Sequence, residues 1–392
     1  MVHVSGDLSQ INIQVCSRCI YDERVSAISF DEDGVCNYCH QQDMLVNQYG
    51  TAAAKGENRF LQIVEDIRRD GKGKRYDCIV GVSGGTDSSY MLHLAKEHNL
   101  RPLAVHYDNT WNTAIATQNI RKMLGALDVD LYTHVVANKE SDDIFRAFFF
   151  AGVPEIEAAT DLALAEVMYR AANKWNIKYI LDGHSFTTEG ITPVGNNYFD
   201  GKYIRSIHKS YGRLPLKSYP LMSFSRFLYW SCVSRIKKIR PYWYINYSKE
   251  DAMALLSEKY DWTYYGGHHL ENRMTAFCHG VYLPEKFNAD LRNNTLSALA
   301  RSGKLTRQEA WHRYSAPKHI EYGLIDYFCK RLELSVSEYD RVMQSPPRSW
   351  VEFPTYKKRF EYLRPLFAVL AEADLVPKSF YLKYCFPVEG NK

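Results

Sequence analysis

Apolar and polar residues follow one another in blocks through the middle of the chain, and the blocks predict strands and helices in turn. Short apolar runs, typical of buried strands, lie at residues 77–82, 102–107, 131–136 and 177–181. Between them, residues with helical spacing lie at 87–98, 113–124, 142–150 and 160–175. Strands that alternate with helices of this length predict the α/β class, with a parallel sheet and helices on both faces.

The residues before and after this α/β block do not show the same alternation of strands and helices. The first forty residues contain four cysteines, and a polar stretch at 48–58 reads as a linker before a helix at 59–69. From about residue 251 the pattern is mainly helical, with proline-marked breaks. We therefore predict a small domain at 1–47, an α/β domain at 58–250 and a mainly helical region at 251–392.

Composition is that of an ordinary globular protein. Of 392 residues, 46% are hydrophobic, and 49 Lys and Arg against 45 Asp and Glu give a net charge of +4, which excludes collagen-like, coiled-coil and disordered classes. No apolar run approaches the roughly 20 residues that span a bilayer, and the N-terminus lacks a signal-peptide pattern. We expect a soluble cytoplasmic protein without a transmembrane segment, for which nucleic-acid binding by bulk charge is unlikely.

The average charge conceals one basic stretch. Residues 201–249 contain eleven Lys or Arg, eleven aromatics and no Asp or Glu, so the remaining chain carries 4 − 11 = −7. Basic residues interleaved with aromatics are typical of single-stranded RNA binding. The stretch could equally line a pocket for a charged substrate, dock an acidic partner, lie on an anionic membrane or form a solvated face.

The loop after the first predicted strand is the most specific signal. It consists of Ser83, Gly84, Gly85, Thr86, Asp87 and Ser88 and opens the next helix. Glycines let the backbone approach an anion, and a helix N-terminus presents free N–H groups to it. The two serines add hydroxyl donors, and Asp87 can hold the Mg²⁺ that accompanies a polyphosphate. The alternative is a glycine-rich turn without a ligand.

Four cysteines form the metal candidate. Cys16 and Cys19 are one CxxC pair, Cys36 and Cys39 are a second, and sixteen residues separate the pairs. Four thiolates at this spacing suit a structural zinc ribbon, where Zn²⁺ replaces a core too small to fold alone. Disulfides are disfavoured in the cytoplasm, whereas an iron–sulfur cluster stays open. The other five cysteines are scattered and read as inert core residues.

The loop resembles the pyrophosphate-binding loop (PP-loop) of the N-type ATP pyrophosphatases, which have a HUP-like fold and cleave ATP to AMP and pyrophosphate. The resemblance implies that residues 83–88 bind ATP and that Ser83, Asp87 and Ser88 take part in catalysis. Many members have lysine where Thr86 stands, so a phosphate counter-charge must come from elsewhere or from the metal alone. Asp108 ends the second strand and matches the family's acidic residue near the ribose or metal, although it could also be a turn residue.

A further loop follows the fourth strand. In this superfamily the corresponding loop faces the adenylate and the acceptor, which implies nucleotide contact for Gly183, a catalytic role for His184 and substrate contact for Glu189. His184 is as well explained as a structural histidine.

The ordered set of segments resembles a narrower group, the N-acetyl sugar amidotransferases of bacterial surface-polysaccharide biosynthesis. The segments are the cysteine pairs, the loop, DNTWNT at 108–113, GGHHLENR at 266–273, YLPEKF at 282–287 and SGKLTR at 302–307. The resemblance covers residues 16–311. It implies that an acetamido group of a nucleotide-activated sugar becomes an acetamidino group, with ATP, in lipopolysaccharide or O-antigen biosynthesis.

The chain shows no glutaminase signature, neither an N-terminal cysteine nucleophile nor an evident Cys-His-Glu set. We therefore expect ammonia from a separate partner, which in this family resembles the glutaminase subunit of imidazole glycerol phosphate synthase, with a barrel-type subunit beside it. Candidates for holding substrate or phosphates, each of which could also be a surface charge, are Glu271, Arg273, Lys286, Arg292 and Arg307.

The rival function is a tRNA-thiolating enzyme of the same superfamily, which the basic, aromatic stretch and the cysteine pairs would suit. Against it, thiolation in that group typically uses additional cysteines near the adenylate, and none lies in the loops described above. We favour substrate and partner contact for residues 201–249, because the expected acceptor itself carries phosphate.

Overall fold

A five-stranded parallel sheet forms the centre of the chain in the computed structural model, which describes residues 13–191, 193, 198–267, 270–318, 320–373, 375–376 and 378–387. Its order is β3-β2-β1-β4-β5, and every neighbouring pair is parallel. The strands are β1 (Cys78–Gly81), β2 (Pro102–Asp108), β3 (Leu131–Val135), β4 (Tyr179–Leu181) and β5 (Lys237–Ile239). The predicted α/β class and the first four strands are confirmed.

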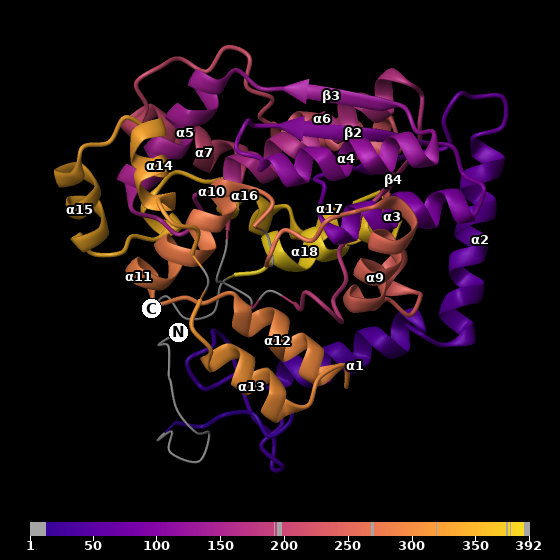
Figure 1. Cartoon of the computed structure of the whole chain (residues 1–392), viewed down its shortest axis with the longest axis horizontal. Helices are drawn as coiled ribbons and strands as arrows, with labels where there is room; N and C mark the ends of the chain where they lie inside the picture. Colours follow the sequence, from indigo (N-terminus) through magenta and orange to yellow (C-terminus); the bar gives the residue numbers. More distant parts are fainter. Residues whose placement is uncertain are drawn as a thin grey trace.

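Helices cover both faces of the sheet, as predicted (Figure 1). On β1, Cys78 and Val80 belong to a core shared with α2 (Ala54–Asp70), α3 (Thr86–Glu97), α4 (Ala114–Leu127) and α9 (Lys249–Tyr260). The residue between them, Ile79, packs instead with α6 (Ala158–Lys174). Successive side chains of a strand point to opposite faces, so burial on both faces explains why β1, β2 and β4 are continuous apolar runs, whereas the edge strand β3 is half-buried or exposed.

The fifth strand was not predicted. β5 has three residues, Lys-Lys-Ile, and pairs with β4 from Tyr179 opposite Lys237 to Leu181 opposite Ile239. It lies in the basic stretch, after α7 (Gly201–Tyr211) and α8 (Phe224–Leu228). Charged residues are typical of an edge strand, because they discourage pairing with other chains. With no apolar run, this strand has no sequence signal of its own.

The C-terminal region is mainly helical, as expected. After α9 it contains α10 (Arg273–Phe277), α11 (Leu283–Phe287), α12 (Arg292–Arg301), α13 (Arg307–Ser315), α14 (Leu324–Arg331), α15 (Val336–Gln344), α16 (Lys357–Tyr362), α17 (Arg364–Glu372) and α18 (Lys378–Tyr384). The linker expected at 48–58 is shorter, because α1 (Asn37–Tyr49) is followed by α2 from Ala54. Ala, Lys and Glu at the start of α2 are good helix formers.

The cysteine-rich segment packs against helices from the far end of the sequence. Its cysteines share one hydrophobic core with Leu296 and Leu299 of α12 and Trp311 of α13. Figure 1 shows α1 beside α12 and α13. The division at 1–47, 58–250 and 251–392 stays a prediction, but its first and third parts share this core. Among the described residues, no helix is both long and apolar enough to cross a membrane.

Candidate active site and metal centre

The loop at residues 83–88 and the loop that follows β4 meet at one edge of the sheet. The chain leaves β1 toward β2 on one side, whereas β4 lies on the other side of β1, so the strand order switches direction between β1 and β4. Ligands of open α/β sheets bind at the carboxyl ends of strands at such a point. A Cβ placed on Gly183, after β4, would lie 3.4 Å from the backbone of Asp87, after β1. The two loops are therefore in contact.

Gly84 fixes the path of the loop. Its φ is +82°, and a Cβ built on it would lie 2.2 Å from the carbonyl oxygen of Ala116 in α4. Its own carbonyl oxygen accepts hydrogen bonds from Trp262 Nε1 at 3.1 Å and Asn119 Nδ2 at 3.2 Å. Only glycine fits this conformation and this close approach.

We expect Gly84→Ala to destabilise the fold and to remove nucleotide binding. The collision with Ala116 should lower the free energy of unfolding by about 3 kcal/mol. Gly73 is a matched control, because its φ is +77° and nothing lies within 4 Å of its Cβ position. Gly73→Ala should cost only about 1 kcal/mol. Urea unfolding measures both, and equal costs would show that the contact with Ala116 is unimportant.

The two loop serines hold each other in place. Ser83 Oγ and Ser88 Oγ lie 3.3 Å apart, and Ser83 Oγ accepts the Gly85 N–H at 3.2 Å. Ser88 Oγ donates to the Gly85 carbonyl at 3.2 Å. Directly after Gly85, α3 begins with no side-chain cap. The first N–H groups of a twelve-residue helix and two hydroxyls thus gather at one place, an arrangement that suits a phosphate group.

Asp87 is held by residues that the sequence analysis did not single out. Tyr247 Oη donates to its carboxylate at 2.5 Å and Lys249 Nζ at 2.8 Å, while Tyr242 Oη donates to its carbonyl at 2.7 Å. Burial opposes the charge of Lys249, but Asp87 outweighs it and raises the pKa of Lys249. These three residues end the basic stretch, and no local pattern distinguishes them from its other basic and aromatic members.

Two further carboxylates face the same ammonium group. Glu189 and Glu271 both interact electrostatically with Lys249. A Cβ on Gly85 would lie 3.2 Å from Glu271 Oε1, which places this carboxylate against the loop. Three carboxylates around one ammonium leave an excess of negative charge. Oxygen ligands are what Mg²⁺ prefers, so Asp87, Glu189 and Glu271 fit a site for this cation.

The loop after β4 is also strongly charged. Burial would raise the pKa of Asp182, but Lys238 and Arg240 outweigh it and hold the pKa well below its usual range. Burial, with Arg240 and Lys238, lowers the pKa of His184 to about 4. His184 is therefore neutral at pH 7. Trp243 Nε1 donates to His184 Nδ1 at 3.3 Å, which leaves the proton on Nε2, 3.9 Å from Glu189.

The end of β2 has a mainly structural arrangement. Asp108 accepts the Thr110 N–H at 2.7 Å, which is a turn contact. Asn272 Nδ2 donates to the side chains of Asn109 and Asn112, each at 3.0 Å. These bonds bring the segment that starts with Glu271 to the strand end.

The four basic residues predicted to hold substrate have partners elsewhere in the structure. Arg273 pairs with Glu321 at 2.8 Å, and Arg292 pairs with Asp290 at 2.9 Å. Lys286 is buried and donates to the carbonyl oxygens of Val342 and Ser345. Arg307 donates to the carbonyl oxygens of Cys16 and Cys19, at 2.9 and 3.1 Å. Of the predicted substrate-binding set, the structure brings only Glu189 and Glu271 to the loop.

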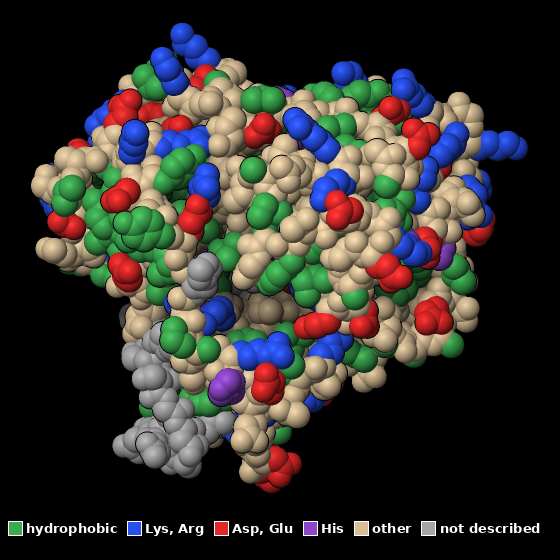
Figure 2. Space-filling view, in the orientation of Figure 1, with side chains coloured by type: hydrophobic (Ala, Val, Ile, Leu, Met, Phe, Trp, Pro, Cys, Tyr) green, Lys and Arg blue, Asp and Glu red, His purple; other side chains and the backbone are tan. Residues whose placement is uncertain are grey.

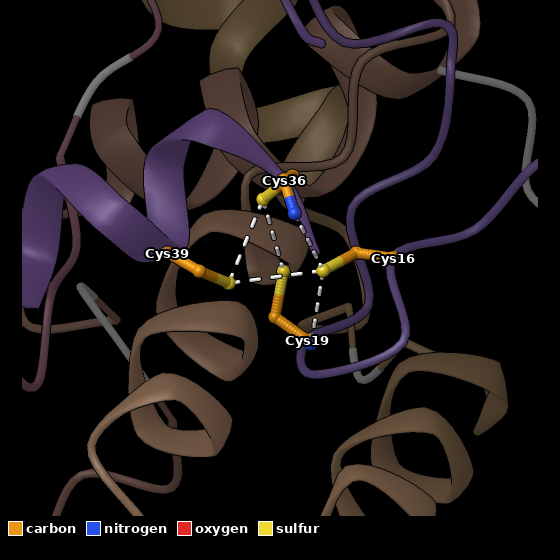
Figure 3. A group of neighbouring side chains, drawn as sticks. All are labelled: Cys16, Cys19, Cys36 and Cys39. Atoms are coloured by element: carbon orange, nitrogen blue, oxygen red, sulfur yellow. Dashed lines mark hydrogen bonds between the residues drawn. The ribbon is translucent and has the colours of Figure 1, made fainter. Parts of the chain in front are cut away.

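The four cysteines converge on one point (Figure 3). All are fully buried, and their sulfurs are 3.7 Å apart for Cys16 and Cys39, 3.8 Å for Cys19 and Cys36, and 3.6 Å for Cys36 and Cys39. A single tetrahedral ion with bonds of about 2.3 Å to sulfur separates its ligands by about 3.8 Å. The cysteines therefore fit one metal ion.

A buried arginine balances this centre. Arg301 is 2% exposed, its Nη2 lies 3.4 Å from Cys19 Sγ, and its guanidinium lies 4.1 Å from the centre of the Tyr21 ring. Among the described residues, its Nε and Nη1 have no hydrogen-bond partner. Burying an arginine is costly unless negative charge lies beside it. Metal-bound thiolates at the four cysteines would supply that charge, whereas neutral thiols would not.

A cavity of about 780 Å³ lies beside β4 and β5. β5, α6, α8 and the C-terminal helices contribute to its wall, which combines aromatic side chains with basic and acidic ones. Its cationic side chains include Lys237, Lys238 and Arg240 of the basic stretch. Trp243, which hydrogen-bonds His184, also lines it. Trp243 therefore links the cavity wall to the loop that follows β4.

The chain is also similar, at low sequence identity, to several known proteins. Over 171 residues the chain is 29% identical to an uncharacterized protein of Methanocaldococcus jannaschii. The aligned segment covers 43% of this chain and 58% of that protein. Among solved structures, NMN synthetase from Francisella tularensis has a TM-score of 0.33 at 11% identity, over 68% of this chain and 98% of that one. The U34-tRNA thiolase NcsA from Methanococcus maripaludis has a TM-score of 0.32 at 14% identity, over 86% and 97%.

A family model matches part of the C-terminal helical region. Residues 271–366 match the family described as "LPS biosynthesis protein WbpG-like, C-terminal domain". The match begins at Glu271, the carboxylate that lies against Gly85, and it includes α10 to α16. It agrees with the surface-polysaccharide family expected from the ordered segments. Residues 271–366 are therefore similar to the C-terminal domain of WbpG-like LPS biosynthesis proteins.

Proposed function

We propose that the protein is an ATP-dependent amidotransferase that converts an acetamido group of a nucleotide-activated sugar to an acetamidino group in lipopolysaccharide or O-antigen biosynthesis. One observation carries the proposal: Glu271, the first residue of the WbpG-like segment, lies against the nucleotide-type loop that follows β1. A polysaccharide-biosynthesis domain thus completes a site suited to phosphate. ATP places the reaction in the cytoplasm.

The chemistry has two steps. The acetamido oxygen bonds to the α-phosphorus of ATP, and pyrophosphate leaves. Ammonia then attacks the carbon of this adenylated imidate, AMP leaves with the oxygen, and protons are released. An amide oxygen is a poor leaving group, whereas AMP is a good one. The protein must mainly hold the reactants in line and stabilise phosphate charge.

The residues around the loop divide these tasks. The N–H groups at the start of α3, with Ser83 and Ser88, hold the pyrophosphate portion of ATP. Mg²⁺ held by Asp87, Glu189 and Glu271 would neutralise polyphosphate charge. Neutral His184, whose proton is on Nε2, donates a hydrogen bond to the adenylate or the acceptor, and Gly183 leaves room for it. Asp108 keeps its proposed place near the ribose.

We propose the cavity beside β4 and β5 as the acceptor site. Its volume of about 780 Å³ is within the range of small-molecule sites, roughly 300–1,000 Å³. Aromatic side chains can stack on a base, and Lys237 can pair with a diphosphate, joined by Lys238 and Arg240, which also pair with Asp182. This gives the basic stretch a role as the anion-binding wall of the site. Arg273, Lys286, Arg292 and Arg307 support the surrounding structure instead.

We infer that Zn²⁺ occupies the four-cysteine centre. The sulfur separations of 3.6–3.8 Å suit one ion, whereas in a 4Fe–4S cluster each thiolate binds a different iron and the cluster body holds the sulfurs apart. Four thiolates and Zn²⁺ carry a charge of −2, which Arg301 partly offsets.

Ammonia comes from a separate glutaminase partner in this proposal, with a barrel-type subunit beside it. The alternative, a tRNA-thiolating enzyme, would have to use the same loop. Basic and acidic side chains are interspersed over the described part of the face in Figure 2, which does not favour a nucleic-acid surface there.

Lys249 supplies a testable detail. Because Thr86 carries no charge, the partly buried ammonium of Lys249, 2.8 Å from the Asp87 carboxylate, is a candidate for the missing cation. We expect Lys249→Met to lower kcat/KM for ATP by about 100-fold, since a preorganised charge is lost where phosphate charge develops. Lys259→Met is the matched control, because Lys259 lies on the same helix and faces Glu97. An unchanged kcat/KM in Lys249→Met would remove this role.

The products of ATP test the activation step. With an ammonium salt and nucleotide-linked acetamido sugars, we expect AMP and pyrophosphate, formed only when both co-substrates are present. Formation of ADP and phosphate would contradict the proposed step.

A further inference from the structure

A second group of metal-ligand side chains lies outside the four-cysteine centre. Glu157 directly precedes α6, and Cys278 and His279 open η4 (Cys278–Tyr282), a π-helical turn that continues α10. One ligand atom from each of the three residues lies within 4.8 Å of the others. Turns of this type are rare and are frequent at functional sites.

Hydrogen bonds orient the carboxylate toward the other two side chains. Thr275 Oγ1 donates to Glu157 Oε1 at 2.5 Å, and His279 Nε2 lies 3.3 Å from Glu157 Oε2. A hydroxyl that fixes a carboxylate in this way is typical of the second layer around bound metals. Cys278 is 2% exposed, whereas the side chains of His279 and Glu157 are 26% and 21% exposed. The group is therefore closed on the sulfur side and open on the other.

The group does not suit nucleophilic catalysis, although it contains cysteine, histidine and glutamate. A catalytic cysteine needs an accessible sulfur and a positive environment that favours the thiolate. Cys278 has neither, because its sulfur is buried and its charged neighbours include Glu157 and Asp161. A glutaminase active site is therefore excluded for these three residues.

We propose that Glu157, Cys278 and His279 bind a second Zn²⁺ ion. Sulfur, nitrogen and carboxylate oxygen together are a donor set that zinc accepts, and three protein ligands leave a fourth position open. One thiolate and one carboxylate neutralise Zn²⁺. No buried arginine is then needed, in contrast to the four-thiolate centre with its Arg301. This site is independent of the function proposed above.

Zinc stoichiometry of the full chain tests the proposal. Protein saturated with Zn²⁺ and then desalted should contain two zinc ions per chain in the wild type and one in His279→Ala. His312→Ala should keep two, because His312 is an exposed histidine on α13. A wild-type chain that holds a single zinc ion at saturation overturns the proposal, whatever the variants do.

Cobalt substitution gives a second readout that identifies the ligand. Co²⁺ bound by thiolates has sulfur-to-metal absorption in the near ultraviolet. Cys278→Ser should lose about one fifth of it, because one of five thiolates is removed. The circular dichroism spectrum shows whether the variant is folded, and a folded Cys278→Ser with unchanged cobalt absorption contradicts the second site.

Discussion

Asp87→Asn should abolish AMP formation while leaving the fold intact. The amide keeps the shape of the side chain but loses the charge that pairs with Lys249 and that would bind the cation of the nucleotide. We expect kcat to fall by about 1,000-fold or more, since the proposed role of Asp87 is at the reacting phosphates rather than in the distant core. Production of AMP and pyrophosphate measures the effect.

A double variant separates catalysis from stability. In Asp87→Asn the partly buried Lys249 loses its hydrogen-bonded carboxylate partner and keeps only the electrostatic interactions with Glu189 and Glu271, which should cost about 2 kcal/mol in the free energy of unfolding. Asp87→Asn combined with Lys249→Met removes both charges and should recover much of this stability, yet remain inactive. If activity returned together with stability, Asp87 would have a structural role only.

The four-cysteine centre should show the second large effect. Cys16→Ser combined with Cys36→Ser removes two of four metal ligands, and a structural zinc site contributes roughly 10 kcal/mol to folding. That exceeds the stability of many domains. We expect the double variant to lose its metal and to aggregate, because the same core includes Leu296, Leu299 and Trp311 of the C-terminal region.

Cys232→Ser is the matched control for this experiment, because Cys232 lies outside the metal centre in a short π-helical turn. It should keep its metal content and its thermal unfolding midpoint. Metal analysis and circular dichroism check both proteins. A double variant that is folded without metal would show that the C-terminal helices alone hold the segment in place.

The sequence predicted those parts of the fold that repeat a local pattern. The four apolar runs became β1 to β4. Burial on both sheet faces explains the continuous apolar residues of β1, β2 and β4, whereas β3 at the sheet edge is half-buried or exposed. The SGGTDS loop and the cysteine pairs were recognisable because their chemistry needs fixed spacing. β5 was missed because three residues at a sheet edge have no apolar period.

The parts of the site that could not be predicted depend on contacts between distant residues. Lys249 and Tyr247 lie about 160 positions from Asp87 along the chain, and nothing near them in the sequence marks their role. Arg307 resembled a substrate ligand, but it donates to the carbonyl oxygens of Cys16 and Cys19. Only packing of the C-terminal helices on the cysteine-rich segment reveals that contact.

The most direct test of the proposed function follows the sugar itself. The full chain is incubated with ATP, an ammonium salt and a panel of UDP- and CMP-linked acetamido sugars, with Asp87→Asn as control, and the products are analysed by mass spectrometry. We predict one sugar whose mass changes by the exchange of O for NH, with AMP and pyrophosphate in equal amounts, and no change with Asp87→Asn. Unchanged sugars, together with a modified tRNA in a parallel reaction, would contradict the account.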